Sequence, residues 1–262
     1  MATTVSTPLL MLSLFFILNS IPIPSFSCPS HHKQALLHFK STLTKAINSG
    51  SFELIQLKSW NSTSDCCFWE HVNCAGTKTV TELHLDGVIV PLPDIDPVPI
   101  LSNILAPLFH TRSCQIPSQL FELKSIHVLD LSDNTIEGDL SAEVGKLVNL
   151  ESLYLGGNFL LGKIPQEIGN LSKFREFSLQ NNHFFGGIPS SIENLKKLEI
   201  LDLAVNSFSM QIPNFIGKLS SMIALDLSKN QFTGPIPSSM QNLSKLELLH
   251  LHENMLNGEI PT

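Results

Sequence analysis

Hydrophobic and polar positions recur with a period of 24 residues through the second half of the chain. Each period has the order leucine or phenylalanine, any residue, leucine, two further residues and asparagine. The asparagines are Asn134, Asn158, Asn182, Asn206, Asn230 and Asn254. A hydrophobic residue stands two positions after each asparagine, glycine stands four positions after five of the six, and an Ile-Pro pair comes next in the last five. Such fixed self-similarity predicts a protein built from stacked repeats.

Each repeat is predicted to form a short strand, because leucines that alternate with other residues point to one face of a strand. The chain must turn back within one repeat, so successive strands should form a parallel ladder, and the whole an α/β repeat solenoid. The asparagine stands where the strand ends, and its amide is predicted to satisfy backbone groups that the bend leaves unpaired. Apolar pairs at helical spacing, such as Val144 and Leu147, should complete the core.

A solenoid exposes its core at each end, and residues 28–78 are predicted to cap the first end. Ser30 suits a helix N-cap. One apolar face comes after it at Leu36, Phe39, Leu43 and Ile47, and Gly50 suits the helix end. Four of the five cysteines lie in this segment, at Cys28, Cys66, Cys67 and Cys74. Four clustered cysteines predict a cap that is braced by two disulfides. Three different pairings of these cysteines are possible.

Residues 79–125 fit the repeat poorly. Val80, Leu83 and Leu85 begin a first repeat, but five prolines from Pro91 to Pro107 interrupt the next stretch of the chain. Either two degenerate repeats or one repeat with an insertion fits this segment. Cys114 takes the slot that Gly138 holds one repeat later, and three roles stay open for it: a free thiol, an intermolecular link or none. Residues 126–262 then hold six 24-residue repeats, of which the last is incomplete.

The first 27 residues contain no Asp, Glu, Lys or Arg, and an apolar run at 9–18 precedes the small residues Ser25 and Ser27. The run is too short to span a bilayer, so residues 1–27 are predicted to be a cleaved signal peptide. Export makes disulfides permissible. No second apolar run of 18 or more residues occurs, so this chain is predicted to contain no transmembrane segment.

Charge and motifs limit the function further. The net charge of −7 and the pI near 5.8 argue against nucleic acid or an anionic membrane surface as the main partner. The ten histidines are scattered, without a carboxylate at metal-ligand spacing, and no nucleophile elbow, phosphate loop or HExxH motif occurs. The sequence therefore predicts a protein that is not an enzyme and that uses no metal or cofactor.

The string Asn-x-Leu-x-Gly-x-Ile-Pro and the cap cysteines resemble the plant extracellular leucine-rich-repeat family, which includes receptor-like proteins, receptor-like kinases and polygalacturonase inhibitors. The resemblance covers residues 28–262. It implies a right-handed leucine-rich-repeat superhelix with its strand ladder on the concave face. It also implies the disulfides Cys28–Cys66 and Cys67–Cys74.

Residues between and after the strand leucines are predicted to face solvent on the concave side. Candidate ligand contacts are Tyr154, Glu176, Gln180, Asp202, Asp226, His250 and His252. Five of them depart from the common repeat pattern. Asp202 and Asp226 belong to a recurring Leu-Asp-Leu string, so a binding role and an ordinary surface role carry equal weight for them.

Three sequons, at Asn61, Asn170 and Asn242, predict N-glycosylation. Asn170 and Asn242 are three repeats apart, so both should point away from the strand ladder and leave the concave face open. For Asn170 and Asn242 the alternative is that Asn-Leu-Ser is a packing motif that matches by chance.

Taken together, these features and the resemblance favour the ligand-sensing ectodomain of a plant receptor-like protein in defence or developmental signalling. The expected partners are a protein or peptide ligand, or a glycan, and a co-receptor kinase. The expected location is extracellular, at the cell surface or cell wall, with plasma-membrane association only through a partner or a missing C-terminal segment. The alternatives are a secreted inhibitor of a cell-wall-degrading enzyme and a truncated scaffold without ligand. The apolar end of the last repeat is expected to fray or to associate unless a partner covers it.

Overall fold

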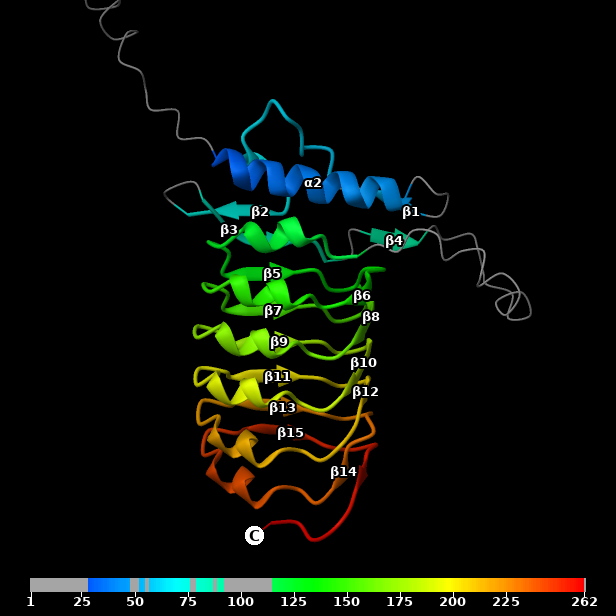
Figure 1. Ribbon diagram of the computed structural model, residues 1–262, viewed down its shortest axis with the longest axis vertical. Coiled ribbons are helices and arrows are strands. Elements are labelled where there is room, and N and C mark those ends of the chain that lie inside the picture. The colour runs from blue at the N-terminus through cyan, green and yellow to red at the C-terminus, as the bar shows by residue number, and fades with distance from the viewer. Residues whose placement is uncertain are drawn as a thin grey trace, which may run out of the picture.

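The computed structural model describes residues 28–47, 52–54, 57–75, 79–86, 89–91 and 115–261. The predicted signal peptide, Gly50 and Cys114 lie outside these residues. The described repeats stack one on another below the N-terminal helix, with the C-terminus at the opposite end (Figure 1).

One sheet runs the length of the stack and contains every Leu-x-Leu segment. Its parallel strands are β3 (Val80–His84), β5 (Val128–Asp130), β7 (Ser152–Tyr154), β9 (Glu176–Ser178), β11 (Ile200–Asp202), β13 (Ala224–Asp226) and β15 (Leu248–His250). Equivalent residues pair from strand to strand, so Leu129 lies beside Leu153 and Leu201 beside Leu225. The inward side chains of β5 to β13 are at most 1% exposed, whereas Leu249 of β15 is 42% exposed. The predicted parallel ladder is thus confirmed.

The recurrent asparagines join each repeat to the one before it. The Nδ2 atom of Asn158 donates to the carbonyl oxygens of Leu131, Leu155 and Gly156 at 2.9, 3.0 and 3.2 Å. Its Oδ1 atom accepts the N–H of Ile136 at 2.9 Å. The same pattern recurs at Asn182 and Asn230. This confirms the predicted role of the asparagine as a substitute partner for backbone groups at the bend.

A second set of parallel strands follows the asparagines in each repeat. The sequence pattern did not predict these strands. It consists of β6 (Glu137–Asp139), β8 (Phe159–Gly162), β10 (His183–Gly186) and β12 (Ser207–Phe208), and separately of β14 (Thr233–Gly234) with β16 (Met255–Leu256). The hydrophobic residue two positions after each asparagine points inward from this set. Phe184, Phe208 and Phe232 stack there with ring centroids 6.2 Å apart.

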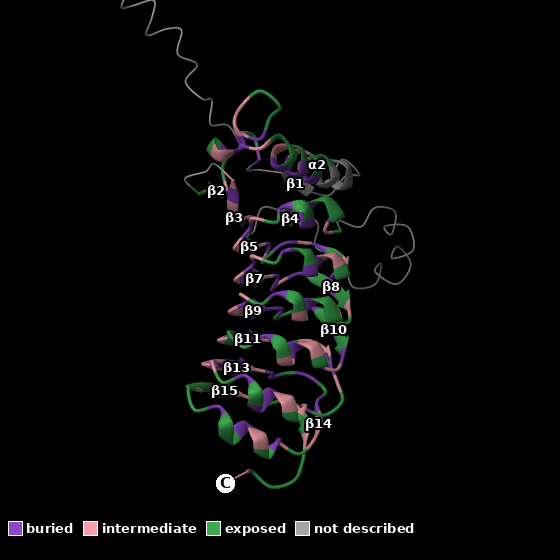
Figure 2. Ribbon diagram, turned by 60° about the vertical axis from the view of Figure 1, so that its left-hand side comes forward, coloured by how far each residue is buried: buried purple, intermediate pink, exposed green. Residues whose placement is uncertain are grey.

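Short 3-10 helices complete each turn on the side away from the main ladder. They are η2 (Ser118–Glu122), η3 (Ala142–Lys146), η4 (Gln166–Asn170), η5 (Ser190–Asn194), η6 (Asn214–Lys218) and η7 (Ser238–Asn242). A proline in extended conformation stands immediately before every one of these helices except η3. Proline favours this position because its ring restricts φ and it has no N–H to donate. Val144 and Leu147, the pair predicted to complete the core, are fully buried. Figure 2 shows the buried residues along the inside of the stack and the exposed ones on its outer surface.

The cap covers the first repeat with helix α2 (Ser30–Ile47) and strand β2 (Val72–Cys74), which pairs antiparallel with β3. Leu36 and Phe39 of α2 are buried. The strand β1 (Phe52–Leu54) pairs antiparallel with β4 (Ile89–Pro91), and η1 covers Cys66–Phe68. The disulfides are Cys28–Cys66 and Cys67–Cys74, as the family resemblance implied.

Direct pairing of β3 with β5 bears on the irregular segment. Leu83 lies beside Leu129 although they are 46 residues apart, nearly twice the spacing of later neighbours. No described strand of the main ladder lies between them. A repeat with a ladder strand of its own between β3 and β5 is therefore not part of the described sheet, and the choice between two degenerate repeats and one repeat with an insertion stays a prediction.

Candidate functional site

Strand pairing aligns the last residue of every ladder strand in one row across the concave face. From the cap downwards, this third-position row consists of His84, Asp130, Tyr154, Ser178, Asp202, Asp226 and His250. Neighbouring strands of a sheet lie about 4.8 Å apart, so adjacent members of the row are within reach of one another. Four of the seven predicted contact residues therefore belong to one continuous line.

Tyr154 and Glu176 form the upper part of the candidate site. The Tyr154 hydroxyl donates a short hydrogen bond to Oε2 of Glu176 on the next strand. Burial, and then the bond to Glu176, raise the pKa of Tyr154 to about 12. Tyr154 therefore stays protonated at physiological pH and holds the Glu176 carboxylate in place. Gln180, two residues beyond Ser178, is exposed beside them.

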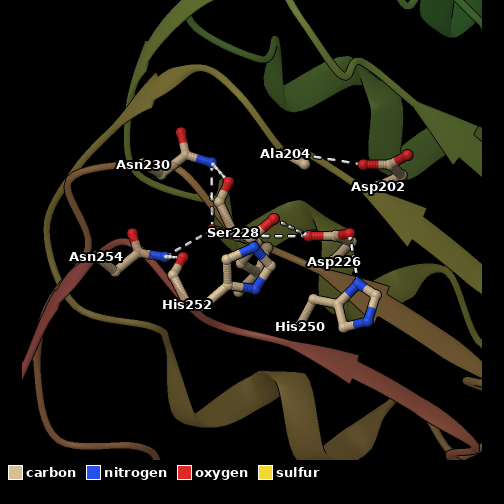
Figure 3. Close-up of polar contacts among 9 residues, drawn as sticks. Asp202, Ala204, Asp226, Ser228, Asn230, His250, His252 and Asn254 are labelled. Carbon is tan, nitrogen blue, oxygen red and sulfur yellow. Dashed lines mark hydrogen bonds and ion pairs between the residues drawn. The ribbon is translucent and has the colours of Figure 1, made fainter.

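Asp226 and His250 form the lower part of the site (Figure 3). Nδ1 of His250 lies 2.9 Å from Oδ2 of Asp226. Oδ1 of Asp226 accepts hydrogen bonds from the N–H and the hydroxyl of Ser228 at 2.9 and 2.6 Å. Burial alone would raise the pKa of Asp226, but the bonds from Ser228 and His250 outweigh it and lower the pKa. The exposed ring of His252 contacts His250 edge-on, with centroids 5.7 Å apart.

Asp202 occupies the same place in its repeat as Asp226 but has different surroundings. Burial, and then the neighbouring charge of Asp226, raise the pKa of Asp202, although a 3.1 Å hydrogen bond from the Ala204 N–H opposes this. In Figure 3 the side chain of Asp202 lies apart from the two histidines. The seven predicted contacts thus fall into two groups, with Tyr154, Glu176 and Gln180 above and the two aspartates and two histidines below.

Not every residue between the strand leucines faces solvent, which corrects the general expectation for this face. Ser152, Ser178 and Ser228 are 8%, 9% and 4% exposed. Their side chains are too small to reach the outer surface of the face. These three serines are therefore buried beneath the concave surface and are not available as outer contact residues.

A hollow between the repeats of β5 and β9 was also missed by the sequence reasoning. It has a volume of about 170 Å³, and Asp130, Ser132, Asp133, Tyr154, Gly156, Ser178 and Gln180 line it. The available signal was the Gly156-Gly157 pair, because each of the other five 24-residue repeats carries side chains at those two positions. This hollow lies on the concave face, beside Asp130, Tyr154 and Ser178 of the third-position row.

A row of paired polar residues, one before each of the strands β5, β7, β9 and β11, was missed as well. Glu151 Oε1 lies 3.1 Å from His127 Nδ1, and Glu151 Oε2 lies 3.7 Å from Arg175 Nε. Arg175 also pairs closely with Glu199. The 24-residue spacing of these four residues, in which glutamates alternate with a histidine and an arginine, was a readable signal. The pairs satisfy one another, so the row borders the site instead of offering unpaired charges.

The sequons lie away from the concave face. Asn170 and Asn242 are the exposed last residues of η4 and η7, three repeats apart on the opposite side of the stack. Asn61 is exposed in the cap, where its Oδ1 accepts hydrogen bonds from Thr63 and Ser64. Glycosylation itself stays a prediction, but sugars at these positions would leave the third-position row free.

Within the described residues, one group of potential metal ligands is close enough to share an ion: Cys28, Asp65, Cys66 and Cys67. Its three sulfur atoms are in disulfides, so they are not available as thiolate ligands. None of the described helices has the length and apolarity needed to cross a bilayer.

Known proteins show the same architecture. The leucine rich repeat N-terminal domain matches residues 29–75, and the leucine rich repeat matches residues 149–171, 173–195, 197–219 and 221–243. The chain belongs to the leucine-rich-repeat proteins. The cap and the central repeats are therefore recognised separately, each by its own sequence signature.

Relatives of this leucine-rich-repeat protein are plant receptor-like proteins. Receptor-like protein 46 of Arabidopsis thaliana is 36% identical over 123 residues, which are 46% of this chain and 13% of that protein. Receptor-like protein 31 of the same plant is 32% identical over 138 residues, or 52% of this chain and 14% of that protein. The chain thus spans a small part of the length of the receptor-like proteins that it matches.

Solved receptor ectodomains have the same fold. The crystal structure of PEPR1–AtPEP1 superposes with a TM-score of 0.71 and 27% identity, covering 89% of this chain and 29% of that chain. The Arabidopsis receptor kinase HAESA, solved with the peptide hormone IDA and the co-receptor SERK1, superposes with a TM-score of 0.65 and 30% identity. That match covers 82% of this leucine-rich-repeat protein and 33% of the HAESA chain.

Proposed function

We propose that this chain is a ligand-sensing part of a plant receptor-like protein, and that its concave face binds an extracellular peptide or protein. The observation that carries the proposal is the third-position row. Tyr154, Asp202, Asp226 and His250 present different chemical groups along one line of strands. A rigid scaffold with a variable polar face is the arrangement by which repeat proteins bind extended partners.

The dimensions of the face support a peptide. Seven parallel strands form the ladder, and a spacing of about 4.8 Å between strands makes the row roughly 29 Å long. An extended peptide rises about 3.3 Å per residue, so roughly nine residues would lie along the row. Sequons on the opposite side support the same orientation, because sugars there would not block the approach of a ligand.

The relatives support the receptor context. The matched proteins are named receptor-like proteins, and one of the superposed ectodomains, HAESA, was solved with the peptide hormone IDA. For this chain a co-receptor kinase is proposed as a second partner, in line with the presence of SERK1 in the HAESA structure. An extracellular location is proposed with it.

A matched pair of charge reversals tests the proposal. Glu176 lies on β9 of the concave face, and Glu167 is exposed on η4 of the opposite side, nine residues earlier. The secreted wild-type chain, Glu176→Lys and Glu167→Lys are each incubated with extracellular peptides of plant tissue, and retained peptides are identified by mass spectrometry. We expect one set of peptides to be retained by the wild type and Glu167→Lys but lost with Glu176→Lys.

The reverse result, in which Glu167→Lys loses the peptides and Glu176→Lys keeps them, places binding on the other side. Failure of the wild type to retain any peptide contradicts peptide sensing by this chain. Circular dichroism on all three proteins verifies that they are folded.

A further inference from the structure

We propose that the hollow above Gly156 and Gly157 is a subsite for one cationic side chain, an arginine or a lysine. It would receive that side chain from the ligand of the concave face, so the inference rests on the proposed function and makes the ligand more specific. Peptides that carry a basic residue opposite β7 are the partners it selects.

The size of the hollow fits a single side chain. Its volume of about 170 Å³ is well below the roughly 300 Å³ at which pockets begin to hold whole small-molecule ligands. Its lining includes Asp130 and Tyr154 of the third-position row, so a side chain of an extended peptide on the concave face reaches it directly. A ligand of the face would therefore insert one residue here.

The backbone of the repeat does not require glycine at these positions. The second residue after the inner strand leucine adopts a left-handed φ in all six 24-residue repeats: 67° at Gly157, 52° at Asp133, 53° at Asn181, 54° at Val205, 53° at Lys229 and 54° at Glu253. Five of these six residues carry side chains. The backbone conformation therefore does not explain the glycine at position 157, and the reason must be the space available for a side chain.

The space that the glycines leave is occupied by their neighbours. A Cβ atom on Gly157 would lie 2.3 Å from Oδ1 of Asp133, and one on Gly156 would lie 2.8 Å from Cγ of Gln180. The two glycines thus allow Asp133 and Gln180 to close in from either side. The carboxylate and the amide become walls of the hollow because the two glycines between them have no side chains.

Backbone donors around the hollow are already used. The N–H of Asp133 donates to the Gly156 carbonyl at 2.8 Å, and the N–H of Gly157 donates to the Gln180 carbonyl at 2.9 Å. The N–H of Ser132 donates to Oδ1 of Asp130 at 3.0 Å. An anionic ligand group therefore finds none of these three N–H groups free.

Two of the three side-chain hydroxyls that line the hollow, those of Ser132 and Tyr154, are used in the same way. The Ser132 hydroxyl donates to Asp130 at 2.6 Å, and the Tyr154 hydroxyl donates to Glu176. These groups still offer lone pairs, together with those of the Asp130 and Asp133 carboxylates. No cationic side chain is among the residues that line the hollow. Guanidinium and ammonium groups carry only donors and a positive charge, so they complement this set.

The subsite is tested on the secreted full chain by NMR titration with N-acetyl-arginine amide, N-acetyl-lysine amide and the neutral analogue N-acetyl-citrulline amide. We expect saturable shifts of the Gly156 and Gly157 amide signals with the two cations, with a Kd of about 1 mM. Citrulline amide should give none. Asp133→Asn should weaken arginine amide binding about tenfold, which is the value of one charge-assisted hydrogen bond.

A matched pair of variants distinguishes cation binding in the hollow from cation binding elsewhere on the concave face. Gly157→Lys places an ammonium group inside it, and Val205→Lys makes the same change two repeats further on. The backbone accepts lysine at this φ, as Lys229 shows with 53°, but at 157 the Asp133 side chain must swing aside, because a Cβ atom there lies 2.3 Å from its Oδ1. Circular dichroism verifies that both variants are folded. Gly157→Lys should abolish the shifts, and Val205→Lys should preserve them.

The inference is overturned if arginine amide gives no saturable shifts, if citrulline amide binds equally well, or if Gly157→Lys binds like the wild type. These outcomes do not depend on a natural ligand. Cation binding here without peptide retention on the Glu176 side would overturn the proposed function alone, and peptide retention without cation binding would overturn only the subsite.

Discussion

The side-chain amide of Asn182 donates a 2.9 Å hydrogen bond to the carbonyl oxygen of Leu155 in the preceding repeat. The same amide donates to the Leu179 and Gln180 carbonyls, and its oxygen accepts the Leu160 N–H at 2.9 Å. Asn182 is 6% exposed. One buried side chain therefore satisfies four backbone groups in two repeats.

Asn182→Ala should lower the free energy of unfolding by at least about 2 kcal/mol, because several buried backbone groups lose their partners and each costs roughly 1–3 kcal/mol. Urea unfolding followed by circular dichroism measures the change. The control is Asn181→Ala, since Asn181 is the exposed preceding residue. Equal unfolding midpoints for the two variants would contradict a structural role for the Asn182 amide.

Loss of a cap disulfide should destabilise the first repeats. Cys28–Cys66 ties the start of α2 to η1, and removal of such a bond costs about 2–5 kcal/mol. Cys66→Ser is expected to reduce the secreted yield well below that of the wild type. Cys114→Ser is the comparison, because the other four cysteines pair among themselves. The same yield for both variants, measured by quantitative immunoblot, would argue against a folding role for the cap.

Tyr154 is the only tyrosine, so its ionisation is visible in the ultraviolet spectrum of the whole chain. The phenolate absorbance of the folded protein should have a midpoint near pH 12 rather than 10.0, because the pKa is raised. Glu176→Gln should move the midpoint down, because it removes a negative charge and weakens the bond. It should remain above 10.0, since burial is the larger cause. A midpoint of 10.0 in a chain that circular dichroism shows to be folded would exclude the buried hydrogen bond.

Asp226 and Asp202 should have opposite effects on stability as pH changes. The pKa of Asp226 is lowered in the folded state, so its ionised form stabilises the fold above its ordinary pKa of 3.8, and this is lost as pH falls through the lowered value. Asp226→Asn should therefore destabilise the protein at about pH 7, and the destabilisation should shrink as pH falls below 3.8. The pKa of Asp202 is raised, so its ionised form is unfavourable. Asp202→Asn should stabilise the protein at neutral pH, and the gain should vanish below 3.8.

Urea unfolding of both variants and the wild type across this pH range provides the measurement. Each asparagine can still accept the backbone N–H that the aspartate accepts, from Ala204 or from Ser228. The comparison therefore isolates the charge. If the free energy of unfolding changes with pH in the same way for Asp202→Asn and Asp226→Asn, the pKa values of the two aspartates do not shift in opposite directions.

The sequence by itself determined the features that each repeat carries within its own 24 residues. The Leu-x-Leu pattern specified strands with Leu153 and Leu201 inward, and the position of Asn158 specified a side chain that pairs with backbone groups. Both follow from local periodicity and from the cost of an unpaired buried polar group. The cap pairings Cys28–Cys66 and Cys67–Cys74 followed from the family resemblance.

Only the tertiary structure decided the features that depend on the next repeat. The second set of strands, including β8 and β10, forms because stacking brings segments together that have weak strand signals of their own. The hollow depends on Asp133 and Gln180 closing over two glycines from the adjacent repeats. Asp202 and Asp226 occur in the same Leu-Asp-Leu string, yet their pKa values shift in opposite directions. At Asp202 burial is the main cause that raises the pKa, and the neighbouring charge of Asp226 adds to it. At Asp226 the hydrogen bonds from Ser228, and from His250 of the next repeat, outweigh burial.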